Sequence, residues 1–303
     1  MIDMHEHDVP EPGVLKLGRH PGHVHGAARE HDRATLSNAY LRLDVEAGAR
    51  GGIGQFGWTE RGILTSVFRR ADGWNPVPDA DALSCHPLIR IQSATDDLLV
   101  ENWRLDAVEE NAVCLKAELA DVYCASQTYT LDGSTLDITI GLANTGATPL
   151  QCGIDIRSSF VRDPDTRISA PADGILIAER AGDHPRLVPT PPAWQFGVAY
   201  PLPATTVNHL FMGWGGQALV EWPARRFSLA IEGDTNCYRL DALPGEESFS
   251  FQLVHDPLGQ RGVQGDDVHG LTVLDAGKTL VRRVSFTVER PGCPARTTRH
   301  TTN

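Results

Sequence analysis

Histidines and cysteines can bind metals, carry protons or act as nucleophiles. His20, His23 and His25 stand close together in the string HPGHVH, and imidazoles at this spacing can converge on one transition metal ion. The alternative is a solvated tail, because ordering a polar segment around an ion costs conformational entropy. The six cysteines include no CxxC pair, so zinc-ligand spacing is absent and buried thiols are expected. We predict no metal site and no cofactor.

Other catalytic signatures are missing. The sequence has no glycine loop followed by Lys-Ser/Thr, no Gly-x-Ser-x-Gly elbow and no HExxH, so nucleotide hydrolysis, α/β-hydrolase chemistry and zinc proteolysis have no support. The 303 residues carry 27 Lys+Arg against 39 Asp+Glu, a formal net charge of −12. Phosphates would be repelled by this balance, so we predict neither a nucleic-acid partner nor an anionic membrane partner.

The composition indicates a folded protein. Hydrophobic residues make up 41% of the chain, which is enough for a sizeable core. No apolar run approaches the roughly 20 residues that span a bilayer, and the N-terminal string MIDMHEHDVPEP lacks the basic-then-apolar order of a signal peptide. These features predict a cytoplasmic location.

The elements that would position functional side chains are strands. Leu41, Leu43 and Val45 alternate with polar residues, as in a half-buried strand. The clearest hairpin joins 126–131 to 135–142 through Asp-Gly, which adopts a positive φ at low cost. Further strands are predicted at Ile53 to Trp58, Ala218 to Trp222, Phe227 to Ile231, Tyr238 to Leu240, Ser248 to Val254, Leu271 to Leu274 and Val281 to Val288.

Long helices are not expected, because no window of 12 or more residues shows a 3.6-residue apolar stripe. The fold class predicted is all-β, a large antiparallel β-sandwich with few short helices. We expect one domain over residues 34–290, a polar N-terminal arm or tail over 1–33 and a C-terminal tail over 291–303.

Several strings, in a fixed order between Thr35 and Glu289, resemble the aldose 1-epimerase (galactose mutarotase-like) family. The strings are Leu43 to Gly52 (LDVEAGARGG), Cys85 to Leu88 (CHPL), Thr135 to Gly146 (TLDITIGLANTG), Gly153 to Phe160 (GIDIRSSF), Val207 to Pro223 (VNHLFMGWGGQALVEWP) and Phe251 to Pro257 (FQLVHDP). The resemblance implies the family's sandwich fold and a small sugar as the ligand.

The family's reaction opens a sugar ring with one base and one acid, and two positions here depart from its pattern. The base is a glutamate before proline in the family, and Asp256 stands at that place. The acid is a histidine, and Arg157 stands at that place. A guanidinium stays protonated and cannot donate a proton in turnover, but it can bind a carboxylate or phosphate with two hydrogen bonds. Arg157 therefore indicates a lost acid, an acidic sugar, or a surface arginine paired with Asp155 or Asp163.

The resemblance also suggests substrate-binding positions. Arg90 stands three residues before the place of the family's Asn-Arg pair, where Ser93 and Ala94 stand here, and Asn208 replaces the family's acidic residue. His86 and His255 are candidate replacement acids. Most tryptophans are expected in the core, with Trp103 and Trp214 as candidate platforms for a sugar ring.

Two functions from different classes remain open. One is an isomerase that interconverts sugar anomers, with Asp256 as the base and an acidic sugar as the substrate. The other is a non-catalytic carbohydrate-binding or sensing protein that kept the sandwich and lost the acid. A different reaction on the same scaffold, such as lyase or epimerase chemistry at another carbon, is a third interpretation. The sequence does not predict an oligomeric state.

Overall fold

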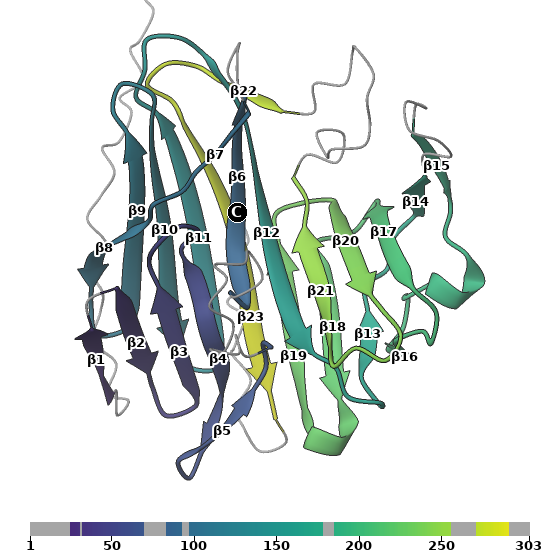
Figure 1. Ribbon diagram of the computed structural model, residues 1–303. Helices are drawn as coiled ribbons and strands as arrows, with labels where there is room; N and C mark the ends of the chain where they lie inside the picture. Colours follow the sequence, from purple (N-terminus) through teal and green to yellow (C-terminus); the bar gives the residue numbers. More distant parts are fainter. Residues whose placement is uncertain are drawn as a thin grey trace, which may run out of the picture.

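The chain folds as two large antiparallel sheets packed face to face (Figure 1). The computed structural model describes residues 25–30, 32–69, 83–92, 97–177, 185–255 and 271–290, with only the backbone for 25–30 and Asp97. In this part of the chain the only helices are the 3-10 turns η1 (Pro192–Trp194) and η2 (Pro223–Arg225). The all-β fold class with few short helices is therefore confirmed.

The first sheet has 14 strands. Its main path runs β1 (His25–Glu30), β2 (Arg33–Ser37), β3 (Leu41–Glu46), β4 (Gly52–Glu60), β6 (Cys85–Gln92), β12 (Leu150–Val161), β21 (Ser248–Leu253), β20 (Cys237–Ala242), β17 (Val207–Met212), β14 (Gly174–Ile177) and β15 (Arg186–Pro189). Three short strands pair beside this path: β5 (Ile63–Ser66) on β4, β7 (Asp97–Leu99) on β6 and β22 (Thr272–Leu274) on β12.

The second sheet has nine strands. Their order is β16 (Tyr200–Pro201), β13 (Arg167–Ser169), β18 (Gln217–Trp222), β19 (Phe227–Gly233), β23 (Thr279–Glu289), β11 (Thr135–Asn144), β10 (Tyr123–Asp132), β9 (Ala112–Leu119) and β8 (Arg104–Val108). The predicted hairpin is β10–β11: Asp132 pairs with Thr135, and Gly133 has a φ of 58°.

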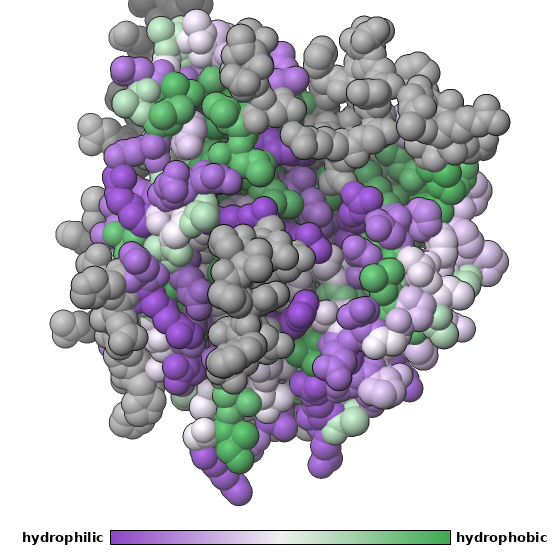
Figure 2. All heavy atoms as spheres, viewed as in Figure 1, coloured by the Kyte–Doolittle hydropathy of each residue, from purple (hydrophilic) through white to green (hydrophobic). Residues whose placement is uncertain are grey.

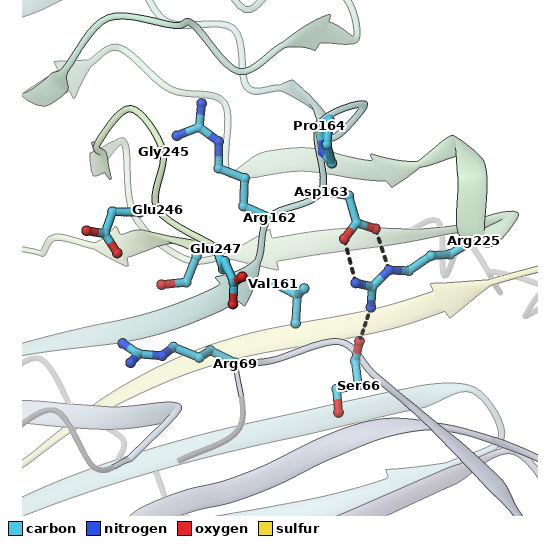
Figure 3. A pocket seen from close by; sticks show the side chains of 11 residues that line it. Ser66, Arg69, Val161, Arg162, Asp163, Pro164, Arg225, Gly245, Glu246 and Glu247 are labelled. Atoms are coloured by element: carbon cyan, nitrogen blue, oxygen red, sulfur yellow. Dashed lines mark hydrogen bonds and ion pairs between the residues drawn. The ribbon is translucent and has the colours of Figure 1, made fainter. Parts of the chain in front are cut away.

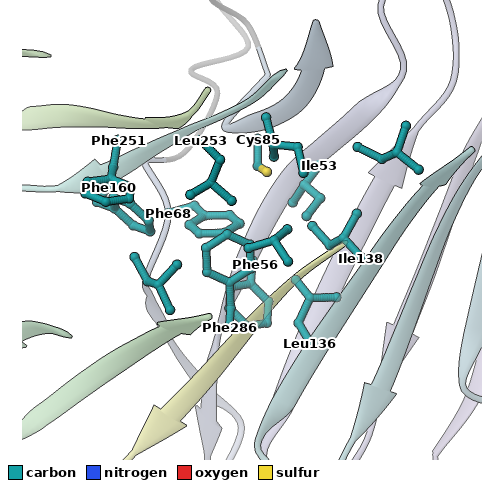
Figure 4. Packing of buried hydrophobic residues seen from close by; sticks show 14 of the residues in the cluster. Ile53, Phe56, Phe68, Cys85, Leu136, Ile138, Phe160, Phe251, Leu253 and Phe286 are labelled. Atoms are coloured by element: carbon teal, nitrogen blue, oxygen red, sulfur yellow. The ribbon is translucent and has the colours of Figure 1, made fainter. Parts of the chain in front are cut away.

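An aromatic cluster fills the centre of the space between the sheets (Figure 4). The Phe68 ring lies 5.0 Å from Phe56, 5.3 Å from Phe160 and 5.2 Å from Phe286, measured between centroids. Phe56 and Phe160 belong to the 14-stranded sheet and Phe286 to the nine-stranded sheet. Such pairs add about 0.5–1.5 kcal/mol beyond burial of their area, so this cluster fixes how the sheets meet.

Strand alternation on β12 separates core residues from polar ones. Ile154, Ile156 and Phe160 are buried toward the core, whereas Asp155 and Arg157 between them project from the opposite face because successive side chains alternate. We call the side of the 14-stranded sheet that turns away from the nine-stranded sheet the outer face. Its polar residues are the ones that the resemblance connects with a sugar.

The predicted terminal segments are described only in part. Residues 25–30 form β1 and pair with β2, so this part of the predicted arm is joined to the sheet. His20, His23 and the tail 291–303 lie outside the described residues, as does the His25 side chain. The division into arm, domain and tail stays a prediction. Within the described ranges, no helix is long and apolar enough to cross a bilayer.

Candidate functional site

A row of polar residues crosses the outer face at its centre. The register aligns His86 on β6, Arg157 on β12, Gln252 on β21 and Arg239 on β20. Opposed residues of antiparallel strands project to the same side, and adjacent strands lie about 4.8 Å apart. The four side chains, which we call the central row, therefore span roughly 14 Å. Figure 2 shows this face, where hydrophilic side chains predominate over β21 and β20.

The next row of the same face is polar as well. Ser159, Ser250, Asp241 and Asn208 are aligned on β12, β21, β20 and β17, and we call them the serine row. The two rows are joined where Arg239 Nε donates to Asn208 Oδ1 at 3.0 Å. Asn208 is exposed, so its amide nitrogen also faces solvent-accessible space. The rows together offer hydroxyl, amide, imidazole and guanidinium groups, which suit a ligand rich in hydroxyls.

A buried carboxylate lies beside the central row and binds three strands together. Asp155 is 2% exposed. Its Oδ2 accepts from Gln252 Nε2 at 3.1 Å and from Arg90 Nη2 at 3.4 Å, and its Oδ1 accepts from the His255 backbone N–H at 3.0 Å. Burial raises the pKa of Asp155, partly offset by the Arg90 charge and the His255 N–H. This carboxylate fixes both Gln252 in the central row and the end of β21.

Arg90 and Arg157 therefore lie on one face, as the sequence interpretation proposed for Arg90. Arg90 opposes Gly153 on β12 and is 24% exposed. The two acids proposed as surface partners of Arg157 have other arginine partners: Asp155 binds Arg90, and Asp163 forms a bidentate ion pair with Arg225. Arg157 is half-buried in the middle of the central row.

The two candidate histidine acids occupy different places. His86 is in the central row directly opposite Arg157 and is 3% exposed. The His255 ring lies elsewhere, because its Nε2 is 2.8 Å from Asp234 Oδ1 and Asp234 Oδ2 accepts from the backbone N–H of Arg283 on β23. The His255 ring thus connects the end of β21 to the nine-stranded sheet. Only His86 is positioned beside Arg157.

The glycine pair that follows β3 leaves room for two large side chains. A Cβ on Gly52 would lie 2.5 Å from the Cys85 carbonyl oxygen and 2.9 Å from His86 Cβ. A Cβ on Gly51, whose φ is 56°, would lie 2.5 Å from Cγ of Trp103. Trp103 is 3% exposed within the hydrophobic core cluster. Its ring faces are therefore covered, and the prediction of Trp103 as a sugar platform is corrected to a core role.

Trp214 also belongs to the core, which corrects the second platform. It is 2% exposed, with its ring edge-on to Tyr238 and Phe251 at 5.6 and 5.7 Å between centroids. Its Nε1 donates to the Gln217 carbonyl oxygen at 2.6 Å. The sequence around Trp103 and Trp214 did not indicate whether either side chain is exposed, because each follows an apolar stretch.

Several predicted positions lie outside the described residues. Asp256, Ser93 and Ala94 are among them, so the structure neither supports nor contradicts Asp256 as a base. Sequence reasoning missed Gln252 and Arg239. Alternation from the buried Phe251 would have placed Gln252 on the outer face, and alternation between Tyr238 and Leu240 would have done the same for Arg239. In the described part of the chain, no group of three or more His, Cys, Asp or Glu is placed to hold a metal ion.

Comparison with known proteins identifies the class of fold. No family model matches the chain. Solved structures match closely: a galactose mutarotase-like protein from Lactobacillus casei ATCC 334, with a TM-score of 0.68 and 11% identity, covers 85% of this chain and 100% of its own. A GalM/aldose epimerase homologue from C. elegans matches with a TM-score of 0.65 at 12% identity, covering 86% of this chain and 99% of its own. The chain has the galactose mutarotase-like fold.

Two comparisons with Escherichia coli K12 give the higher sequence identities. The crystal structure of a provisionally assigned aldose 1-epimerase matches with a TM-score of 0.68 and 24% identity, over 85% of this chain and 98% of its own. The protein YphB, itself uncharacterized, is 26% identical over 291 residues, which is 84% of this chain and 98% of its own. The departures at Arg157 and Asn208 therefore occur in a divergent chain of this fold.

Proposed function

We propose that the protein is a mutarotase-like isomerase that interconverts the anomers of an acidic sugar bound across the central row. The observation that carries this proposal is the alignment of His86, Arg157, Gln252 and Arg239 on one face of a galactose mutarotase-like sandwich. The fold likeness supports a small sugar ligand, and Arg157 and Arg239 are partly exposed in this row, so that their guanidinium groups can donate to it.

We infer that the sugar is acidic because several arginines lie in this part of the outer face. The whole chain has a net charge of −12, yet Arg90, Arg157 and Arg239 lie on three strands of one small area. Asp155 and Asp241 lie on the same face, so three guanidiniums stand against two carboxylates and one positive charge is in excess. Such an excess on an acidic protein attracts anions. Guanidinium groups bind carboxylates with two parallel hydrogen bonds. A uronate, whose carboxylate would lie against Arg157, fits this arrangement better than a neutral aldose does.

The reaction needs two proton transfers. A base removes the proton of the anomeric hydroxyl as the bond between C1 and the ring oxygen breaks, and an acid protonates that oxygen. Rotation about C1–C2 and the reverse transfers close the ring as the other anomer, so both groups are restored. We assign the acid to His86, because it stands beside Arg157, and the base to Asp256 on its sequence position alone. Each positioned group contributes roughly 10² to 10⁴ in rate.

The test is the rate of anomer exchange, measured by NMR exchange spectroscopy or polarimetry. The panel contains galacturonate, glucuronate, galactose and glucose, each compared with buffer. We expect acceleration that is greatest for a uronate. Rates equal to buffer for every sugar would contradict the isomerase.

A second candidate is a non-catalytic carbohydrate-binding protein. It is favoured by the uncharged Asn208 and by Arg157 at the place of the family's acid. Calorimetric binding of a uronate without any change in its anomerisation rate would support this candidate. A large rate loss on Asp256→Ala in an active protein would contradict it.

A further inference from the structure

An open cleft adjoins the serine row at the C-terminal end of β12 (Figure 3). Its volume is about 1060 Å³, and Val161 and Ser248 form part of its lining. Val161 pairs with Ser248, and this pair lies next to the pair of Ser159 and Ser250, on the same side of β12 and β21. The cleft therefore continues the outer face beyond the serine row.

The segment after β5 forms the opposite side of the cleft. Phe68 pairs with Phe160, and the Arg69 backbone N–H donates to the Ser159 carbonyl oxygen at 2.8 Å. This register places Arg69 opposite Ser159, with its side chain exposed and lining the cleft. Ser159, opposite Arg69, is two residues from Arg157, or roughly 7 Å along the strand. That separation suits two joined sugar rings, one over the central row and one at Arg69.

Two of the six charged residues around the cleft neutralise each other, and a third is held by backbone carbonyls. Asp163 pairs with Arg225, and Arg162 donates to the carbonyl oxygens of Leu243 and Pro203 at 2.6 and 3.0 Å. Among the described residues of this lining, the side chains of Arg69, Glu246 and Glu247 form no hydrogen bond or ion pair. In Figure 3 the Glu247 carboxylate points across the cleft toward the segment that carries Arg69.

Two guanidiniums, of Arg69 and Arg162, and two carboxylates, of Glu246 and Glu247, carry opposite charges and do not favour a simple ion. An anion would approach both glutamates, and a cation would approach Arg69. Sugar hydroxyls avoid this conflict, because each hydroxyl both donates and accepts. Arg69 can donate to them, the glutamates can accept from them, and Ser248 can do either. The open side of the cleft also lets a longer chain continue into solvent.

We propose that this cleft is a second saccharide subsite, which binds the sugar unit attached to the one in the central row. This inference rests on the proposed function, because it needs a sugar at Arg157. The natural ligand is then a disaccharide or longer saccharide with a free reducing end in the central row. Charge-assisted hydrogen bonds, donated by Arg69 and accepted by Glu247, strengthen its binding relative to the monosaccharide.

Calorimetry on matched pairs tests the subsite. The probes are galacturonate with digalacturonate, and glucose with maltose. In at least one pair we expect the disaccharide to bind ~10-fold more tightly than the monosaccharide, as for one charged hydrogen bond. Arg69→Ala and Glu247→Gln should abolish this gain and leave the Kd of the monosaccharide unchanged. Both side chains are exposed, so the variants should fold, and thermal unfolding checks this.

Arg167→Ala is the matched control, since Arg167 is an exposed arginine on β13 of the other sheet. It should leave every Kd unchanged. Equal Kd values within both pairs would overturn the subsite while leaving the proposed function standing. A gain that persists in the Arg69→Ala/Glu247→Gln double variant would overturn it as well. If no sugar binds at all, the proposed function fails and the subsite fails with it.

Discussion

The outward faces of the two sheets differ in how far their polar side chains are exposed to solvent. On the nine-stranded sheet, Arg104 pairs with Glu118 and Lys116 with Asp106, and all four side chains are between 34% and 55% exposed. On the 14-stranded sheet, Asp155 and His86 are 2% and 3% exposed although they also project away from the core. One face carries solvated ion pairs, whereas the other buries its polar groups.

The difference shows on which face a charged side chain affects the free energy of unfolding. An exposed ion pair changes the free energy of unfolding little, because water screens both charges. A buried carboxylate must be satisfied by hydrogen bonds, and Asp155 accepts three of them. Such an arrangement on an outward face marks a candidate functional site. Substitutions should therefore have large effects on the outer face of the 14-stranded sheet and small effects on the other.

The largest expected effect belongs to His86. His86→Asn should lower the rate of uronate anomerisation by about 10² to 10⁴, measured by NMR exchange. His209→Asn is the control, because this histidine lies on β17, separated from β6 by three strands, and projects to the opposite side of the sheet, 4.7 Å from the Trp194 ring. A His86 variant that folds and retains the full rate would remove His86 as the acid.

Arg157 should determine the preference for acidic sugars. Arg157→Ala is expected to weaken uronate binding by about 10- to 100-fold, the equivalent of one lost charged hydrogen-bond pair. Binding of the neutral aldose should change much less, and Arg157→Lys should be intermediate because a single ammonium lacks the bidentate geometry. Calorimetry with galacturonate and galactose measures both. Equal losses for the two sugars would contradict recognition of the acidic group.

Asp155 should influence both stability and its pH dependence. Asp155→Asn turns an amide toward three donors, so we expect a loss of about 1–3 kcal/mol in the free energy of unfolding at pH 4. The pKa of Asp155 is raised by burial. Its stabilising contribution is therefore greatest below the usual value of about 3.9 and falls as the pH rises through the raised pKa.

The deficit of Asp155→Asn relative to the unmodified chain should shrink accordingly between pH 4 and pH 7. Urea unfolding across this range measures it. A deficit that grows with pH would show that the buried carboxylate is stabilised in its charged form.

Asp234 should show the opposite pH dependence on a smaller scale. Burial alone would raise the pKa of Asp234, but the hydrogen bond and charge of His255 and the Arg283 N–H lower it. Its contribution is thus present above the usual pKa and is lost as the pH falls through the lowered value. Asp234→Asn should cost less than about 1 kcal/mol at pH 7, with no difference at acid pH. A deficit independent of pH would exclude the ionic contribution.

The smallest effect is expected on the nine-stranded sheet. Arg104→Ala removes one partner of an exposed ion pair, and water screens what remains. The melting temperature and sugar binding should stay within experimental error. A clear loss of sugar binding would mean that the ligand lies on this sheet, which would reverse the contrast between the two faces.

Local features of the fold could be predicted from sequence, while long-range ones could not. The hairpin around Gly133 follows from alternation and one turn dipeptide, and the structure confirms it. The pairing of β12 with both β6 and β21 joins segments far apart in the chain. No local pattern encodes that pairing, so Gln252 and Arg239 became visible as neighbours of Arg157 only in the structure.

The candidate site shows the same limit. Alternation led to the prediction that Arg90 projects into the pocket; the register puts it on the face of Arg157, and its part in a pocket stays a prediction. Trp103 and Trp214 were wrong as platforms, since burial of an aromatic ring depends on which strands cover it. The ring of His255 turns to Asp234, and this contact requires the nine-stranded sheet to be in place. Asp256 stays a prediction.

The central claim is that a sugar binds across His86, Arg157 and Gln252. A crystal soaked with galacturonate tests it most directly. We predict density for one sugar ring over this row, with the carboxylate against Arg157. Density for the sugar on the nine-stranded sheet, or no density under conditions in which calorimetry shows saturation, would contradict the account.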